Sequence, residues 1–281
     1  MLQAADVVFG YNGRRPVLRG VSMEVPANGF AGILGPNGSG KTTLLRVLAG
    51  AVRPASGRVT LDGSDLASIP RQALARRMAV VPQETHLAFD YTVLEVVLMG
   101  RYPHLATFEI EGPEDLAIAR SALAATGTLE LQDRAFDTLS GGEKQRVIIA
   151  SALAQISATT QFPVVPTFRS AGAAGILLLD EPTAALDLAY QLELASLLRS
   201  LQERLPIAVA ISTHDLNFAA GLCRTLVLLK DGQVLASGAT DDVLTPENVR
   251  TLYGVEAEVT RHPATGHITV VPLRRAVETH A

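Results

Sequence analysis

The feature that most constrains the fold is a glycine-rich segment between a short apolar run and a helix-like run. Residues 30–34 are continuously apolar, and residues 42–48 are rich in apolar side chains until Gly50 ends the run. A strand, a tight loop and a helix in this order are typical of a phosphate-binding loop. The phosphate loop comprises Gly35, Pro36, Asn37, Gly38, Ser39, Gly40, Lys41 and Thr42, with Thr43 next to it.

The residue types in this loop suit a nucleoside triphosphate. Positions without side chains let successive backbone N–H groups point into one concavity, and the following helix adds its positive N-terminal end. Lys41 is expected to reach the β- and γ-phosphates, and Thr42 is expected to offer its hydroxyl to Mg²⁺. The alternative is a flexible loop without a ligand, which the strand before and the helix after the loop disfavour.

A second apolar run ends in two adjacent carboxylates. Residues 176–179 are predicted to form a buried strand, and Asp180 and Glu181 follow directly. Buried strands of this kind deliver acids to a phosphate site. We expect Asp180 to hold Mg²⁺ and Glu181 to orient the attacking water or accept its proton. Alone, such a pair is more often a solvated turn, but the phosphate loop reverses that preference.

The remaining pattern predicts an α/β fold. Residues 7–11, 17–18 and 21–25 read as a small antiparallel unit with a break at 12–13. From residue 70 to about residue 134 the strand signals thin out, with helices over 93–99 and 114–125. Leucines at helical spacing over 194–205 separate strands 176–179 and 207–211, which predicts a parallel sheet with right-handed crossovers.

Three features lie near or beyond this core. Residues 226–229 and 234–236 are predicted to form a hairpin that turns at 231–232, and residues 256–260 and 267–271 a second one around 265–266. Residues 156–175 form a long connection, interpreted as a surface loop, with a partner-docking element as the alternative.

Composition excludes several classes of protein. Lysine and arginine total 24 against 28 aspartate and glutamate residues, a net charge of −4, which disfavours a dedicated nucleic-acid binder. No apolar run reaches the roughly 18 residues of a membrane span, and the N-terminus lacks the pattern of a secretory signal, so we expect a cytoplasmic protein. Cys223 is the only cysteine, which excludes an internal disulfide and favours a buried apolar role.

Further motifs resemble those of the ATP-binding cassette (ABC) ATPases. Gln83 follows Val80, Val81 and Pro82 in a segment like that family's glutamine loop. Asp187 stands in a segment like the loop after the acidic strand, and His214 resembles the switch histidine. A signature-like segment precedes the acidic strand, and its residues are Leu139, Ser140, Gly141, Gly142 and Glu143.

The resemblance implies a P-loop NTPase core with an N-terminal antiparallel β subdomain and an inserted helical subdomain. It places an ATPase domain at 1–252, the helical insertion at about 84–150 and a C-terminal β-hairpin tail at 253–281. ATP and Mg²⁺ are the implied cofactors. Two copies would close head to tail around two ATP molecules, with Ser140 and Gly142 of each copy facing the phosphate loop of the other.

The resemblance also assigns roles to individual residues. The catalytic group is Glu181, His214, Lys41 and Gln83, with His214 sensing the γ-phosphate, and the Mg²⁺ ligands are Thr42, Gln83 and Asp180. The nucleotide contacts are the phosphate loop with Thr43, the residues Ser140, Gly141, Gly142 and Glu143, and Asp187. Tyr11 is expected to stack on adenine, with Phe9 a weaker candidate, whereas a strand residue half buried in the sheet is the alternative for Tyr11.

Residues 99–105 and the tail at 253–272 resemble importer ATPases that serve iron-siderophore, haem and cobalamin uptake. This implies a transmembrane permease partner, indirect work with a substrate-binding protein, and a peripheral position on the cytoplasmic face of the inner (cell) membrane. Another transport system, or a soluble ABC ATPase without a transport role, is the alternative. Leu94, Val97 and Leu98 belong either to a groove for the permease or to the helix core.

Ser151 stands where the family commonly has arginine, which weakens the substrate assignment more than the ATPase assignment. A kinase or GTPase has no use for residues 139–143, and the long coiled coil of a DNA-repair ATPase is missing. A non-hydrolysing switch would be expected to lack Glu181. His262 and His267 are interpreted as solvated strand residues, with a metal-binding pair as the alternative.

Overall fold

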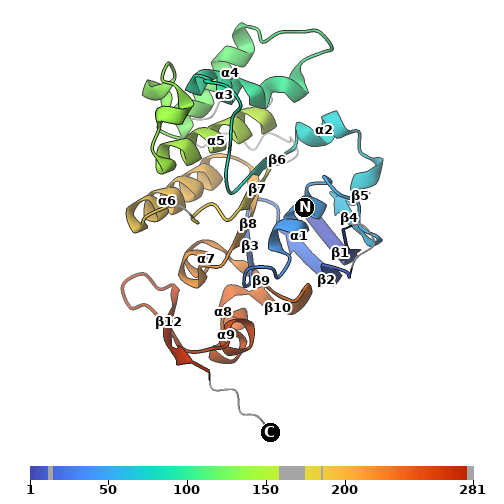
Figure 1. The fold of residues 1–281 in the computed structure, drawn as a ribbon, viewed down its shortest axis with the longest axis vertical. Helices are drawn as coiled ribbons and strands as arrows, with labels where there is room; N and C mark the ends of the chain where they lie inside the picture. Colours follow the sequence, from blue (N-terminus) through green and yellow to red (C-terminus); the bar gives the residue numbers. More distant parts are fainter. Residues whose placement is uncertain (12–14, 158–174, 185, 277–281) are drawn as a thin grey trace. The chain divides into compact units, whose positions relative to one another are not determined.

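The structure is a computed structural model that describes residues 1–11, 15–157, 175–184 and 186–276 (Figure 1). The chain divides into two compact units. The first unit comprises residues 1–67 and 210–281, and the second comprises residues 68–209. The predicted turn at 12–13 and most of the predicted surface loop at 156–175 lie outside the described residues.

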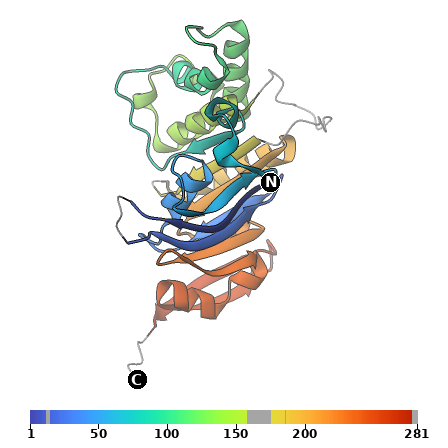
Figure 2. The same cartoon turned by 90° about the vertical axis from the view of Figure 1, so that its right-hand side faces the viewer.

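The first unit contains an antiparallel sheet, drawn in shades of blue in Figure 2, and its strand order is β2-β1-β4-β5. Its strands are β1 (Leu2–Phe9), β2 (Leu18–Val25), β4 (Ser56–Leu61) and β5 (Ser64–Asp65). The predicted antiparallel unit is confirmed, but β1 begins at Leu2 and ends before Tyr11. A register shift between Ala4 and Val7, where Asp6 has a φ of 50°, puts inward side chains three positions apart and hides the strand's alternation.

The same unit holds the strand, loop and helix that the phosphate loop predicts. The strand is β3 (Phe30–Leu34), all of whose residues are buried, and the helix is α1 (Lys41–Leu48). Strand β3 pairs in parallel with β9 (Thr225–Lys230), which pairs antiparallel with β10 (Gln233–Ala239). The predicted hairpin is confirmed, and its turn residues Asp231 and Gly232 have φ angles of 48° and 78°, as expected for a type I′ turn.

The described part of the first unit also contains one helix before this hairpin and further elements after it. Helices α8 (Thr240–Val243) and α9 (Pro246–Tyr253) lead to the antiparallel strands β11 (Val255–Arg261) and β12 (Ile268–Arg275), here called the C-terminal hairpin. Both predicted tail strands are confirmed. Helix α7 (Leu216–Leu222) packs against β12, and Cys223 at its C-terminal end is 4% exposed, which agrees with its predicted apolar role.

The second unit combines parallel strands with helices. Strands β6 (Met78–Val81) and β7 (Gly175–Asp180) are parallel neighbours. The helices are α2 (Arg71–Ala75), α3 (Val93–Leu98), α4 (Pro113–Ala125), α5 (Gly141–Ile156) and α6 (Leu188–Arg204), with 3₁₀ segments η2 (Met99–His104), η3 (Leu129–Leu131) and η4 (Phe136–Thr138). The helices over 93–99 and 114–125 are confirmed within a residue or two. Strand β6 was not expected, because its four residues stop at Pro82 and give no clear periodicity.

Two elements contain the points in the sequence where one unit ends and the other begins. The 3₁₀ segment η1 (Leu66–Ser68) lies at the first boundary, and strand β8 (Ile207–Thr213), fully buried as the predicted strand 207–211 requires, lies at the second. An α/β fold with an antiparallel N-terminal sheet and parallel strands is thus confirmed. Among the described residues, no helix has the length and apolar character needed to cross a bilayer.

Candidate nucleotide site and its family

The phosphate loop, in the first unit, closes tightly on itself. Lys41 is 4% exposed, and its Nζ donates to the carbonyl oxygens of Gly35 at 2.8 Å and Pro36 at 3.2 Å. The Ser39 hydroxyl is buried and has no hydrogen-bond partner among the described residues. An ammonium group lying over a loop beside a buried, unsatisfied hydroxyl is an arrangement suited to a phosphate oxygen.

Two glycines of this loop are required by its geometry. A Cβ at Gly35 would lie 2.2 Å from the carbonyl oxygen of Leu229 and 2.6 Å from the Ser39 hydroxyl. Gly40 precedes α1 with a φ of 106°, a conformation that costs glycine least. The turn of the β9–β10 hairpin supports the loop, since the N–H of Gly232 donates to the Ser39 carbonyl at 3.0 Å. Gly35 therefore stands where the loop lies too close to β9 and to Ser39 to leave room for a side chain.

Tyr11 lies beside the first turn of α1. Its ring meets the Phe9 ring edge-on at 4.9 Å between centroids, and its hydroxyl is 3.4 Å from the Thr43 hydroxyl. Hydrogen bonding to Thr43, and after it Arg46, lowers the pKa of Tyr11 despite the opposing effect of burial. The side chain is 38% exposed, so a ring next to the phosphate loop remains open to solvent. Stacking of adenine on this ring stays a prediction.

The acidic pair, in the second unit, lies at the end of strand β7, whose last five residues are buried. Asp180 is the last residue of β7 and is 9% exposed. Glu181 has a φ of 43°, a left-handed conformation that costs a non-glycine residue about 1–3 kcal/mol. Strained backbone is tolerated where a side chain must be aimed, which fits a carboxylate that orients a reactant. Because β6 and β7 are parallel neighbours, Gln83, two residues beyond β6, lies at the same sheet edge as Asp180.

The signature-like segment forms the N-terminal cap of α5. The Ser140 hydroxyl accepts from the N–H of Glu143 at 3.3 Å, and the Glu143 carboxylate accepts from the Ser140 N–H and hydroxyl at 2.8 Å each. These bonds, the backbone one first, lower the pKa of Glu143. The prediction that Ser140 stands at a helix start is confirmed. Its hydroxyl hydrogen, however, is directed to Glu143, so contact with a phosphate requires that bond to be exchanged.

Gly142 owes its identity to a residue that the sequence did not single out. A Cβ at Gly142 would lie 2.4 Å from the Tyr190 ring. Tyr190 belongs to the first turn of α6, and its N–H donates to the capping carboxylate of Asp187 at 3.0 Å. The signature-like segment and the Asp187 loop are therefore held together through one aromatic ring. Only the spacing of Tyr190 three residues after a capping aspartate could have suggested it.

His214, in the first unit, is exposed and follows strand β8 directly. The Asp215 N–H donates to the Thr213 hydroxyl at 3.0 Å, and the Asp215 carboxylate caps α7 by accepting from the N–H groups of Asn217 and Phe218 at 2.9 Å each. We call residues 213–215 the switch loop. Its backbone is anchored on both sides of the histidine, so the imidazole is presented from a defined position.

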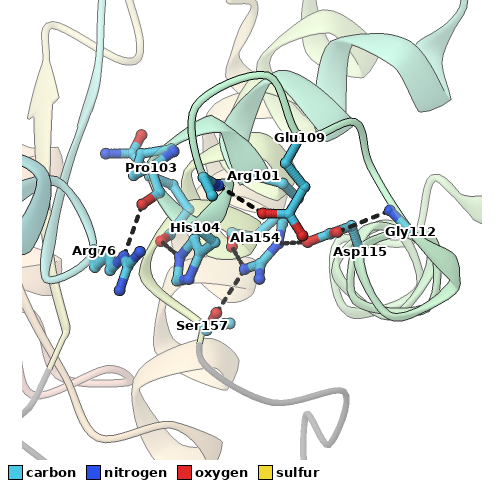
Figure 3. Close-up of polar contacts among 11 residues, drawn as sticks. Arg76, Arg101, Pro103, His104, Glu109, Gly112, Asp115, Ala154 and Ser157 are labelled. Carbon is cyan, nitrogen blue, oxygen red and sulfur yellow. Dashed lines mark hydrogen bonds and ion pairs between the residues drawn. The ribbon is translucent and has the colours of Figure 1, made fainter.

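The segment that resembles importer ATPases, residues 99–105, is partly buried, and Figure 3 shows the polar contacts of Arg101 and His104 within it. Arg101 is 4% exposed, and its guanidinium lies between the Asp115 carboxylate, 2.9 Å away, and the carbonyl oxygens of Ala154 and Ser157 at 2.6 and 2.7 Å. Tyr102, in contrast, is 58% exposed. The segment thus joins the C-terminal end of α5 to α4 while presenting an aromatic ring to solvent.

Two other expectations on this unit have structural answers. Val97 is fully buried and belongs to the helix core, whereas Leu94 and Leu98 are half-buried. Ser151 donates its hydroxyl to the Val96 carbonyl at 3.1 Å, and a Cβ on Gly100 would lie 2.3 Å from the Ser151 carbonyl oxygen. Segment η2 therefore packs closely against α5 at Ser151.

The predicted site residues divide between the units. The first unit holds Tyr11, the phosphate loop with Thr43, and His214, whereas the second holds Gln83, residues 140–143, Asp180, Glu181 and Asp187. The donors predicted for Mg²⁺ are a hydroxyl, an amide carbonyl and a carboxylate, the hard oxygen ligands that this ion prefers. The residues therefore fit both cofactors, while the individual roles stay predictions.

Comparison with known proteins identifies the family. The ABC transporter family model matches residues 18–159. The chain is 45% identical over 276 residues to the hemin import ATP-binding protein of Gloeobacter violaceus, covering 98% of this chain and 95% of that protein. It is 36% identical over 280 residues to the ferric enterobactin transport ATP-binding protein of Escherichia coli, covering 100% and 97%.

Solved structures agree with this result. An inward-facing putative metal-chelate type ABC transporter matches with a TM-score of 0.80 and 29% identity over 97% of this chain and 96% of that one. A dimeric bacterial ABC transporter cassette matches with a TM-score of 0.69 and 28% identity over 85% and 99%. The chain therefore belongs to the ABC transporter family as an ATP-hydrolysing subunit.

Proposed function

We propose that this chain is the nucleotide-binding subunit of an importer that takes up an iron-siderophore, haem or cobalamin-type compound through a membrane permease. The observation that carries the proposal is near full-length identity of 45% and 36% to ATP-binding proteins of hemin import and ferric enterobactin transport. The subunit would sit on the cytoplasmic face of the cell membrane, bound to the permease, with a substrate-binding protein acting on the other side.

The catalytic unit in this proposal is a dimer around two ATP molecules. The phosphate loop of one copy binds the phosphates through its backbone N–H groups and Lys41, and Ser140 and Gly142 of the other copy approach the γ-phosphate. The Ser140 hydroxyl would leave Glu143 for a phosphate oxygen, which remains possible because the Ser140 N–H still satisfies that carboxylate. ATP then holds the two copies together until it is cleaved.

Each remaining residue acts on one part of the reaction. Glu181 orients the attacking water and accepts its proton, and the His214 imidazole contacts the γ-phosphate and registers its loss. Thr42, Gln83 and Asp180 would hold Mg²⁺, which supplies charge neutralisation on the phosphates when bound. Gln83 also lies in the segment that connects β6 to α3. A movement of Gln83 when nucleotide binds or leaves would therefore be passed along this segment to α3.

The Glu181→Gln variant tests the dimer mechanism. We expect ATP hydrolysis to fall at least ~100-fold, because a positioned general base typically contributes 10²–10⁴-fold, and we expect an ATP-dependent dimer by light scattering. Glu203→Gln, an exposed residue near the end of α6, is the matched control and should hydrolyse ATP as the wild type does. A Glu181→Gln protein that turns over at the wild-type rate, or stays monomeric at saturating ATP, would contradict the mechanism.

A separate experiment tests the coupling to transport. The reading frames beside the gene should encode a multi-span permease and a binding protein, and a deletion strain should lose uptake of iron chelates, haem or corrinoids. Purification from native membranes should recover the permease with this chain. Recovery of ribosomes or nucleic acid alone would instead support a soluble ABC ATPase without a transport role.

A further inference from the structure

The C-terminal hairpin is attached to the helix that follows His214 by one side chain. The Asn217 Oδ1 accepts from the Val270 N–H at 2.8 Å, and the Asn217 Nδ2 donates to the Val270 carbonyl at 3.2 Å. Asn217 lies in the first turn of α7, three residues after His214, and Val270 lies in β12. The side-chain amide thus pairs with β12 as a neighbouring strand's peptide group would.

This pairing is specific in its chemistry. An amide offers one acceptor and one donor group, and a single backbone residue of β12 satisfies both. Rotating the amide by 180° would place its N–H donors against the Val270 N–H and its oxygen against the Val270 carbonyl oxygen. The pairing therefore fixes the orientation of the side chain. Val270 is 2% exposed, and bonds to so buried a strand residue hold the first turn of α7 in place.

A second contact reaches the histidine itself. The Tyr253 hydroxyl, at the end of α9, donates to the His214 carbonyl at 3.3 Å. Tyr253 is followed by Gly254, whose φ of 68° ends α9, and then directly by β11. Both contacts therefore come from one continuous stretch of chain that begins at α9 and includes the C-terminal hairpin.

We propose that α9 and the C-terminal hairpin position the switch loop, with Tyr253 and Asn217 as positioning residues for the His214 imidazole. The inference rests on the γ-phosphate contact assigned to His214 under the proposed function, and it gives the tail a role in ATP turnover. Tyr253 restrains the His214 backbone from one side, while Asn217 restrains the helix that Asp215 caps from the other. Without the Tyr253 and Asn217 contacts, the His214 imidazole would lose its contact with the γ-phosphate more readily, while the structure of the phosphate loop would not change.

The chain offers a matched control on the same hairpin. Arg261 in β11 forms an ion pair with Asp241 at 2.6 Å, in which both side chains are more than half exposed. This contact attaches the hairpin to α8 and does not include the switch loop. Removing this ion pair shows whether any loosening of the C-terminal hairpin lowers ATP turnover, or whether turnover falls only when the contacts at the switch loop are lost.

The experiment measures steady-state ATP hydrolysis by the full-length chain and its variants. For Asn217→Ala/Tyr253→Phe we expect kcat to fall roughly tenfold, since small displacements of a reacting group cost up to about 100-fold. We expect KM for ATP to stay within about twofold, because the phosphate loop is unchanged. Asn217→Asp, which keeps the acceptor of the 2.8 Å bond, should fall between this variant and the wild type.

Controls separate positioning from folding. Arg261→Ala should retain wild-type kcat and KM, and all variants are compared at equal folded fraction by circular dichroism. Wild-type kcat in Asn217→Ala/Tyr253→Phe, an equal loss in Arg261→Ala, or a loss explained by unfolding would overturn the inference. If the wild type is active and His214→Ala is inactive in the same assay, such a result overturns the inference alone, whereas an inactive wild type overturns the proposed function with it.

Discussion

Replacing Asp115 by asparagine tests the buried ion pair that joins η2 to α4 in the second unit. The Arg101 and Asp115 side chains are 5% and 14% exposed, and removing one partner of a buried ion pair typically costs ~3–5 kcal/mol. Arg101 would keep its bonds to the carbonyls of Ala154 and Ser157, and the asparagine oxygen can still accept a weaker, uncharged bond. We therefore expect a loss of about 2 kcal/mol of unfolding free energy.

The assay is urea unfolding followed by far-ultraviolet circular dichroism, since the chain contains no tryptophan. Asp115→Leu, which offers no acceptor, should lose more, in the range of ~3–5 kcal/mol. The control is Glu256→Gln, which breaks the more exposed pair with Arg274 and should cost at most ~1 kcal/mol. An Asp115→Asn loss no larger than that of Glu256→Gln would refute the reasoning.

The pH dependence supplies an internal check on the same variant. Burial raises the pKa of Asp115, but hydrogen bonds from Arg101 and from the Gly112 N–H outweigh it, so this pKa lies below its ordinary value. A carboxyl with a lowered folded-state pKa stabilises the fold above its unfolded-state pKa, about 3.9, and loses that contribution as pH falls through the folded-state value. The stability difference between wild type and Asp115→Asn should therefore shrink as the pH falls below the unfolded-state pKa, about 3.9.

Two substitutions and one labelling reaction have direct structural expectations. Gly35→Ala would place a Cβ 2.2 Å from the Leu229 carbonyl oxygen, so we expect loss of ATP binding, measured by equilibrium dialysis, with little change elsewhere. Gly142→Ala would push into the Tyr190 ring and should lower turnover, and Tyr190→Leu in the same chain should restore part of it. Burial raises the pKa of Cys223 to about 12, so the native thiol should resist a thiol reagent at pH 8 and react only as the chain unfolds, and prompt reaction would contradict its burial.

The elements that carry chemistry were the most predictable part of this chain. Residues 30–48 and 176–181 each combine a continuous apolar run with an adjoining motif, so the apolar pattern and the motif predict the same elements. Strand β6 was missed because four residues before a proline carry no period. The start of β1 was missed because a bulge at Asp6 breaks the alternation on which strand prediction depends.

Contacts between distant segments were not predictable in the same way. Nothing local marks Tyr190 as the reason for glycine at position 142, because the two residues lie in different helices. Arg101 lies in the segment 99–105 that resembles importer ATPases, yet it is buried, and its contacts with Asp115 and the end of α5 explain why an arginine stands there. Burial of a charge depends on its partners, which periodicity cannot supply.

Helix α5 gives these contacts a common consequence. Its 16 residues span about 24 Å, with the Ser140 cap at one end and the Arg101 contacts at the other. Because both ends are hydrogen-bonded, we expect loosening of the Arg101 contacts to open the helix as one cooperative unit rather than to fray its C-terminal turn alone. Hydrogen exchange in Asp115→Asn checks this. Faster exchange at residues 152–156 that extends to the amides of 143–146 would support a rigid connection, whereas a loss of protection confined to the C-terminal turn would show that the two ends are independent.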